Sequence, residues 1–417
     1  MDKLKNYLIK EDSITKDAYF WNTVANFIFA FQSVILLMVL TRVVGLEDSG
    51  IFTIAYANAS LFLIIGKFGF RNYQVSDVKT SNTFGDYRMA RVITASAMAL
   101  AGVIYSIWMI FANDYSVYKG IVIALMCIYK LPDAIEDLYH GEYQRQGRLD
   151  VAAKCMTLRL GVSVISFLAC VCITRQMVVS LVISIVLSFI SMIYLLAITR
   201  GGFSFRGDYE WEAVRGLIIA CFPLFAGGFL QQYISNSPKY AIDKLLSDEI
   251  QACYGFIFMP VFVIGLLSSV IFNPIIHTMA EHWANNQQQA FLKRFFVQLA
   301  IILGIAVCAL LGAWFVGIPV LSIIYNTDLS GYKSELIVLL IGGGFLAVSS
   351  FINIILTIIR AQYTLLIGYS IVAIIAFFTS AKAVEYGGVM GASLLYSGLM
   401  LVMAVIFTGF FVYHFKK

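Results

Sequence analysis

The chain has 417 residues, of which 60% are hydrophobic and 13% charged, and its formal net charge is +5. Soluble domains carry about 25% charged residues, so this composition excludes an ordinary soluble protein. It predicts a polytopic helical membrane protein instead. In hydrocarbon only helices and closed barrels satisfy the backbone, and a helix needs about 20 apolar residues to cross.

Apolar segments of that length recur along most of the chain and are separated by short polar breaks. We predict twelve spans, at residues 19–41, 49–70, 88–111, 117–139, 151–173, 177–198, 213–236, 250–276, 291–316, 334–358, 361–380 and 388–413. Residues 1–18 are too polar for the start of a cleavable signal peptide, and we expect them to form a cytoplasmic lead-in. That segment is either a partly amphipathic helix or a solvated tail.

The distribution of Lys and Arg predicts the orientation of the spans. With the N-terminus in the cytoplasm, 22 of the 29 basic residues fall in inner loops and termini, and 7 fall in outer loops. Inner loops of membrane proteins carry the excess of Lys and Arg, so both termini are predicted to be cytoplasmic. This rule accounts for the net positive charge, and no nucleic-acid partner is needed to explain it.

A weak internal repeat divides the chain into two halves. At an offset of 202 residues, an acidic outer loop precedes an aromatic residue, Phe52 in the first half and Tyr254 in the second. Many transporters consist of two repeated bundles that bind substrate between them. We therefore predict an N-terminal six-helix bundle at 19–200 and a C-terminal six-helix bundle at 201–417, with no large extramembrane domain.

Polar and charged side chains inside the predicted spans mark a candidate cavity, because such groups are costly in hydrocarbon unless they face a cavity or a partner. The predicted substrate-binding residues are Asn26, Tyr56, Ser60, Lys67, Arg71, Lys130, Gln232, Asn236, Asn353 and Arg360. The cations among them suit an anionic group such as a phosphate. The amides and the tyrosine suit sugar hydroxyls.

Each of these assignments has a structural alternative. Lys67, Arg71 and Arg360 lie near predicted span ends and could extend to the interface, and amides within spans often bridge helices. Lys130 lies close to Asp133 and Asp137. That group is either an ion pair at a helix end or a site for a coupling H⁺ or Na⁺, with the two carboxylates as ligands.

Several kinds of chemistry have no signature in the sequence. The four histidines lack metal-ligand spacing, no phosphate-binding Gly-rich loop with Lys and Ser or Thr occurs, and no nucleophile elbow is found. We expect no cofactor, no metal site and no enzymatic activity. A transporter of this composition would draw on an ion gradient or on the gradient of its own substrate.

Segments in both halves resemble one group of bacterial transporters. Residues 42–57 and 66–77 are similar to the second-helix region of polysaccharide transporters, and the run Arg71–Asp77 is the most specific part. Residues 141–148 are similar to their loop after the fourth helix, and residues 386–393 to their Gly-rich segment before the last helix. On these segments the chain resembles the O-antigen and capsule repeat-unit flippases (Wzx type), which share the MOP superfamily with MATE antiporters.

The resemblance implies a MATE-like pair of six-helix bundles in the bacterial cytoplasmic membrane. It also implies a function: moving undecaprenyl-pyrophosphate-linked oligosaccharides from the inner to the outer leaflet. H⁺ or Na⁺ would drive this movement, and a glycan polymerase and chain-length proteins would be partners. The alternatives are a MATE-type multidrug or organic-cation antiporter, a membrane polymerase or acyltransferase, and a scaffold in a glycan assembly complex. An antiporter favours an acidic, aromatic cavity, and the predicted cavity is mixed to basic.

Overall fold

The computed structural model describes residues 2–10, 13–77, 82–112, 115–203, 205 and 207–415, with side chains at all of these except 2, 266–275 and 277. Lys79, Arg206, Lys416 and Lys417, which contribute to the charge bias, lie outside the described residues. The chain separates into two compact units, one ending at Phe229 and the other beginning at Leu230.

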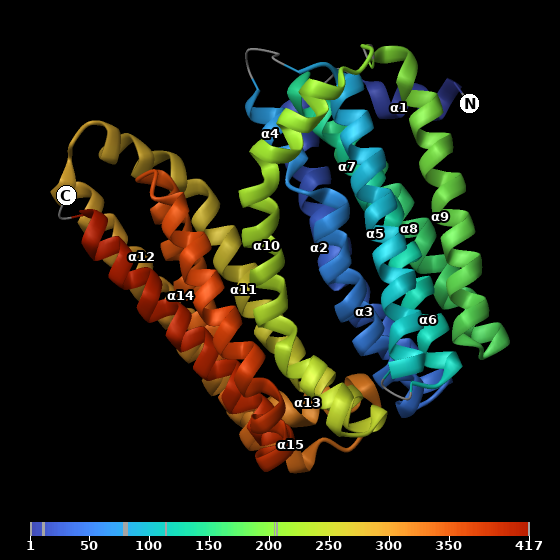
Figure 1. Ribbon diagram of the computed structural model, residues 1–417, viewed down its shortest axis with the longest axis vertical. Coiled ribbons are helices and arrows are strands. Elements are labelled where there is room, and N and C mark those ends of the chain that lie inside the picture. The colour runs from blue at the N-terminus through green and yellow to red at the C-terminus, as the bar shows by residue number, and fades with distance from the viewer. Residues whose placement is uncertain are drawn as a thin grey trace. The chain divides into compact units, whose positions relative to one another are not determined.

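Among its described residues, the first unit has nine α-helices, a short 3₁₀ turn and the first part of a tenth helix. These are α1 (Asp2–Ile9), α2 (Ile14–Val43), α3 (Leu46–Lys67), α4 (Phe70–Ser76), α5 (Phe84–Ala112), α6 (Val117–Tyr129), α7 (Leu131–Arg145), α8 (Leu149–Thr174), α9 (Met177–Thr199), η1 (Arg200–Gly202) and α10 (Trp211–Leu245). The short helices α1 and α4 lie at the same end of this unit (Figure 1).

The fourth predicted span, 117–139, is interrupted in the structure. Lys130 ends α6 and also begins α7, and Pro132 stands in the first turn of α7. Proline has no N–H to donate to the preceding turn, so the helix breaks here. The second part then continues to Arg145, beyond the predicted end.

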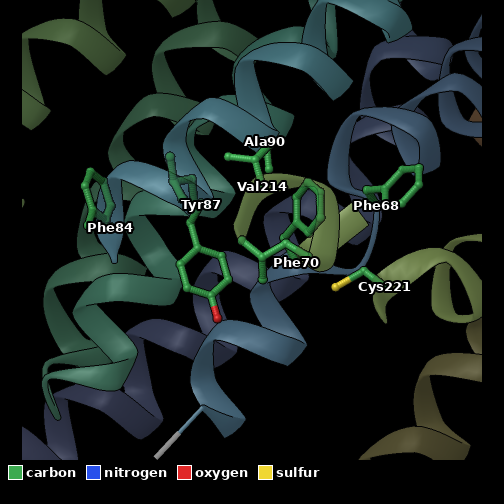
Figure 2. Packing of buried hydrophobic residues seen from close by; sticks show 9 residues of the cluster. Phe68, Phe70, Phe84, Tyr87, Ala90, Val214 and Cys221 are labelled. Atoms are coloured by element: carbon green, nitrogen blue, oxygen red, sulfur yellow. The ribbon is translucent and has the colours of Figure 1, made fainter. Parts of the chain in front are cut away.

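The first part of α10 belongs to the core of the first unit. Val214, Leu217 and Cys221 are at most 2% exposed and pack with residues of α4 and α5 in the cluster shown in Figure 2. Farther along α10, the Phe225 ring stacks on Phe68 with a centroid distance of 4.5 Å. The division between units therefore falls inside α10. The domain limits expected from the sequence, 19–200 and 201–417, stay a prediction.

The second unit contains the rest of α10 and the remaining helices. These are α11 (Asp248–Ala284), α12 (Gln288–Gly312), the π-helical η2 (Ala313–Gly317), α13 (Ile318–Tyr325), η3 (Ser330–Tyr332), α14 (Lys333–Ile358) and α15 (Gln362–Phe415). The predicted break near Arg360 separates α14 from α15, and Arg360 itself has a positive φ of 60°. Phenylalanine stacking fills part of the core, with Phe295 against Phe351 and Phe411 at 5.4 and 4.8 Å.

Two predicted boundaries in the second unit differ from the structure. The span predicted to end at 316 continues through η2 into α13, which ends at Tyr325 where Asn326 adopts the left-handed conformation. The last two predicted spans form one continuous element, α15, in which only Gly388 leaves helical geometry (φ 52°, ψ −133°). Glycine adopts this conformation without steric cost, so one residue replaces the expected loop.

Ten helices among the described residues are long and apolar enough to cross a membrane by length and composition. A straight helix of 54 residues would be about 80 Å long at 1.5 Å per residue, far more than the hydrocarbon core of about 30 Å. Dividing α15 at Gly388 therefore raises the number of candidate spans to eleven. The α6–α7 pair is not among these candidates, so a twelfth span at this position stays a prediction. The described part of the chain is therefore an all-helical polytopic membrane fold.

Candidate functional site

A polar cavity of about 100 Å³ opens inside the first unit, between α2, α3, α4, α7 and α8. Its wall contains both signs of charge, two amides and a histidine, and it is completed by apolar side chains of α2 and α8. The lining residues are Asn22, Asn26, Phe29, Lys67, Arg71, Asp133, Glu136, Asp137, His140, Leu149, Ala152, Ala153 and Met156.

The short helix α7 supplies one wall of the cavity. Asp133, Glu136, Asp137 and His140 follow helical spacing i, i+3, i+4 and i+7, which places all four on one face. None of the four is more than 7% exposed. Buried charges are stable only when they are paired and hydrogen-bonded, so this acidic face requires cations from neighbouring helices.

Arg159 of α8 neutralises two of the carboxylates. Its guanidinium donates to both oxygens of Glu136 at 2.7 and 2.5 Å and to Asp133 at 2.5 Å. It also donates to the Ser188 hydroxyl of α9 at 3.3 Å. Arg159 is 1% exposed, so it cross-links α7, α8 and α9 inside the bundle and has no access to the cavity solvent.

Arg91 of α5 plays the same part for the third carboxylate. It donates to Asp137 at 2.9 Å and to the carbonyl oxygen of Gly66 at 2.5 Å. Arg91 is 2% exposed. The donation to Gly66 also supports the last turn of α3, immediately before Lys67.

Lys130, at the break between α6 and α7, lies in an aromatic cage. Its ammonium donates to Gln32 at 2.8 Å, forms an ion pair with Asp133 at 3.2 Å, and lies over the rings of Tyr56 and Phe29 at 4.6 and 4.9 Å. It is 1% exposed. The pairing with Asp133 is the ion pair at a helix end that was one of the alternatives expected from the sequence, and a role of Lys130 in substrate binding stays a prediction.

Lys67 and Arg71 differ from these three buried cations because their side chains are 32% and 28% exposed. Lys67 is the last residue of α3. Phe68 and Gly69, both with positive φ, then turn the chain into α4, which carries Arg71. Gln144 accepts from the Arg71 guanidinium at 3.0 and 3.3 Å and fixes its direction. The nearest carboxylate oxygen, of Asp137, is 4.0 Å from Lys67 and 3.8 Å from Arg71.

The structure therefore brings Asn26, Lys67, Arg71, Asp133 and Asp137 together at one cavity, as side chains from α2, α3, α4 and α7. Tyr56 belongs to the adjoining cage, and Ser60 is half-buried on α3, one turn farther along.

The other predicted residues lie in the second unit. The Asn236 amide donates to the Gln232 carbonyl oxygen of its own helix at 3.1 Å, and the Asn353 amide donates to the Tyr369 hydroxyl at 2.8 Å. Arg360 is exposed at the end of α14. Their role as substrate ligands stays a prediction.

The sequence-based site omitted Arg91, Arg159, Glu136 and His140. Arg91 and Arg159 lie inside the predicted spans 88–111 and 151–173. The position of these two arginines within predicted spans could have indicated a structural role, because an arginine inside a span requires a buried partner. Among the described residues, no group of three or more His, Cys, Asp or Glu side chains could hold a metal ion.

The sequence matches the model of one protein family, described as polysaccharide biosynthesis protein, over residues 16–283. The chain belongs to the polysaccharide biosynthesis protein family. No curated protein matches the sequence.

Solved structures similar to this family member are MATE and MOP-superfamily transporters. One is an inward-facing multidrug resistance MATE transporter, with a TM-score of 0.68, 12% identity, and coverage of 93% of this chain and 94% of that chain. A second is a variant of the Vibrio cholerae MATE transporter VcmN, with a TM-score of 0.66, 11% identity, and coverage of 97% and 99%. A third is a MOP-superfamily transporter from Pyrococcus furiosus described as having a binding pocket of reverse polarity, with a TM-score of 0.58, 12% identity, and coverage of 97% and 96%.

These likenesses confirm the predicted fold class, because the MATE fold covers nearly all of this family member. The matching family likewise confirms the part of the resemblance that concerns polysaccharide biosynthesis. At 11–12% identity the transporter structures show the fold alone, so the expectation that the chain is not an enzyme stays a prediction. The finer identification as a Wzx-type flippase stays a prediction.

Proposed function

We propose that this protein is a flippase for undecaprenyl-pyrophosphate-linked oligosaccharide repeat units in surface polysaccharide assembly, such as that of O-antigen or capsule. It would move these units from the inner to the outer leaflet of the bacterial cytoplasmic membrane. The observation that carries the proposal is the polar cavity of the first unit, whose most exposed charged side chains are the cations Lys67 and Arg71. Family membership in polysaccharide biosynthesis supports a sugar substrate.

The proposed mechanism is alternating access. The headgroup enters a hydrophilic path from the cytoplasm while the polyprenyl tail stays in lipid, and a conformational change exposes the headgroup outside. Polar side chains along the path replace the water that sugars lose, which lowers the cost of crossing hydrocarbon. The proposed substrate contacts are Asn26, Tyr56, Ser60, Lys67, Arg71, Lys130, Gln232, Asn236, Asn353 and Arg360.

Energy coupling to H⁺ or Na⁺ is part of the proposal, with Asp133 and Asp137 as the proposed ion ligands. A glycan polymerase and chain-length proteins are proposed partners in the same assembly. Both termini are proposed to be cytoplasmic because Lys and Arg concentrate in the loops of that side. Labelling of cysteines introduced one at a time into the loops, with a membrane-impermeant maleimide on intact cells, tests this orientation.

The decisive experiment is the extraction of lipid-linked sugars from cells depleted of the protein, with leaflet location probed by a membrane-impermeant reagent. The expected result is accumulation of polyprenyl-linked oligosaccharide on the cytoplasmic leaflet, whose mass identifies the glycan. Re-expression of the protein should clear the accumulated pool. An unchanged pool with an unchanged leaflet distribution would overturn the proposal.

The second candidate is a MATE-type antiporter for drugs or organic cations. The three carboxylates of α7 at the cavity wall favour it, because an organic cation needs an acidic partner. Each of these carboxylates already has a buried arginine partner, however, which leaves little negative charge for a drug. Depleted cells with a normal lipid-linked pool and new sensitivity to cationic drugs would favour the antiporter.

A further inference from the structure

The charges around the first-unit cavity do not balance. Five cations and three carboxylates are connected by ion pairs, so two positive charges are in excess when all are ionised. The cations are Lys67, Arg71, Arg91, Lys130 and Arg159, and the carboxylates are Asp133, Glu136 and Asp137. A double positive excess inside a membrane bundle is unfavourable unless an anion or water compensates it.

The distances show where this excess is located. Arg91, Lys130 and Arg159 lie 2.5 to 3.2 Å from their carboxylates and are at most 2% exposed. Lys67 and Arg71 are 4.0 and 3.8 Å from Asp137, too far for a hydrogen bond. The three buried cations neutralise the three carboxylates, and the excess remains on the two cations that line the cavity.

Both of these cations have donors available on the cavity side. The Lys67 ammonium makes no hydrogen bond to any described residue, and its one other contact is the Phe29 ring at 5.2 Å. Arg71 uses Nε and Nη2 for Gln144, which leaves Nη1 directed toward the cavity wall of Asp137. Two adjacent cations with free donors are suited to the oxygens of a phosphate group.

We propose that the Lys67–Arg71 side of this cavity is a binding site for a phosphate group carrying two negative charges. A water molecule needs about 10–15 Å³ of such a cavity, so its 100 Å³ hold several waters or one compact group. This size suits a compact anion such as the phosphate end of a substrate. That this phosphate belongs to a polyprenyl diphosphate rests on the proposed function, whereas the charge argument does not.

Binding of inorganic pyrophosphate to the purified full-length protein tests the site. Calorimetry in a maltoside detergent at constant ionic strength avoids phospholipid phosphates and keeps screening fixed. Lys67→Met and Arg71→Gln should each weaken binding about tenfold or more, because each removes a charge-assisted hydrogen-bonding partner. The control Arg88→Gln removes a charge from an exposed position on α5 outside the cavity lining and should bind as the wild type does.

Asp137→Asn gives a test of opposite sign. The substitution keeps the shape of the side chain and removes one negative charge, so the positive excess rises from two to three. Pyrophosphate should therefore bind about threefold more tightly or better, as expected for a change of one unit charge nearby. Wild-type affinity in Lys67→Met and Arg71→Gln, with folding verified by size-exclusion chromatography, would overturn the proposal. Equal weakening in Arg88→Gln would do so as well, since it would indicate a non-specific charge effect.

Competition experiments identify the source of the phosphate. Displacement of pyrophosphate by a short-chain prenyl diphosphate supports the site and assigns it to a lipid carrier. Displacement by a soluble short-chain phosphatidic acid alone supports the site and assigns it to membrane phospholipid. Displacement by inorganic phosphate alone supports it with free phosphate as the ligand. The site and the proposed function fail separately: normal lipid-linked sugars in depleted cells, with pyrophosphate bound through Lys67, would overturn flipping and leave the site intact.

Discussion

The interiors of the two units differ in charge. In the first unit, eleven Lys, Arg, Asp and Glu side chains are at most 7% exposed, and most of them pair with one another. In the second unit, the buried polar side chains among the described residues, tyrosines aside, are amides and hydroxyls. These are Asn236, Ser237, Gln251, Gln298, Ser349, Ser380, Ser393 and Ser397. The second core relies instead on stacked rings and on close contacts such as Gly342 against Tyr396.

Membrane insertion does not explain this difference in buried charge. Both units contain membrane-crossing helices, so apolar length alone accounts for their insertion. Buried ion pairs cost more to desolvate than apolar packing and are weak evidence for stability. Their concentration in the first unit is better explained by a role in binding, for which they hold two unneutralised cations at the cavity. Substitutions in the two units test this asymmetry, and their expected effects run from the largest loss of stability to a gain.

Replacement of Arg159 should have the largest effect on stability. Arg159→Met leaves Glu136 without its partner and Asp133 with Lys130 alone, in a site from which water is excluded. Breaking a buried pair costs about 3–5 kcal/mol, so most of the protein should fail to fold at 37 °C. Expression of a fluorescent fusion, followed by size-exclusion chromatography, measures the folded fraction.

A second variant separates the charge effect from lost packing. Arg159→Met combined with Glu136→Gln removes one unpaired carboxylate and should recover part of the folded fraction. In the second unit, Gln298→Leu is the matched control, because Gln298 is equally buried but carries no charge. Equal loss of folded protein in Gln298→Leu and Arg159→Met would contradict the asymmetry.

Lys130→Met should be less destabilising than Arg159→Met. The methionine fills the aromatic cage, and Asp133 retains Arg159 as its partner, although the Gln32 carbonyl oxygen loses its donor. We expect a loss of about 2–3 kcal/mol, near the lower limit for breaking a buried ion pair. Thermal unfolding in detergent, compared across the two variants, gives the order. A larger loss of stability for Lys130→Met than for Arg159→Met would mean that the main stabilising ion pair lies at the α6–α7 break.

The sequence predicted the fold more completely than the site. Apolar length and the polar breaks gave twelve spans, and the structure differs mainly where a single residue decides the backbone, as at Pro132 and Gly388. Whether a charged side chain within a span is buried in an ion pair or faces the cavity was harder to predict. Lys67 and Arg71 line the polar cavity, and their role as substrate ligands stays a prediction. Helical spacing on one segment does not reveal which neighbouring helix supplies a counter-ion. The roles of Arg91 and Arg159 depend on contacts between helices. Arg91 is 46 residues from Asp137 in the sequence, and Arg159 is 23 residues from Glu136.

Lys67→Met should leave stability almost unchanged while it weakens anion binding about tenfold or more. Its side chain is 32% exposed and 4.0 Å from Asp137, and exposed pairs of this kind contribute about 0–1 kcal/mol. We therefore expect a shift in unfolding free energy of about 0.5 kcal/mol or less, together with loss of clearance of lipid-linked sugars in the cell assay. A loss of stability as large as that of Lys130→Met would make Lys67 a structural residue like Lys130.

A gain in stability, in place of a loss, is expected at a buried amide of the second unit. Gln251 is 0% exposed, and neither its amide oxygen nor its amide nitrogen has a partner among the described residues. A buried polar group without partners costs about 1–3 kcal/mol, so Gln251→Leu should raise the unfolding free energy by about 1 kcal/mol. Thermal unfolding measures the gain, and the cell assay shows whether transport is retained. Higher stability with normal transport would make the interior of the second unit an uncharged packing core. Higher stability with lost transport would mean that Gln251 binds a ligand, so that both units contribute binding residues.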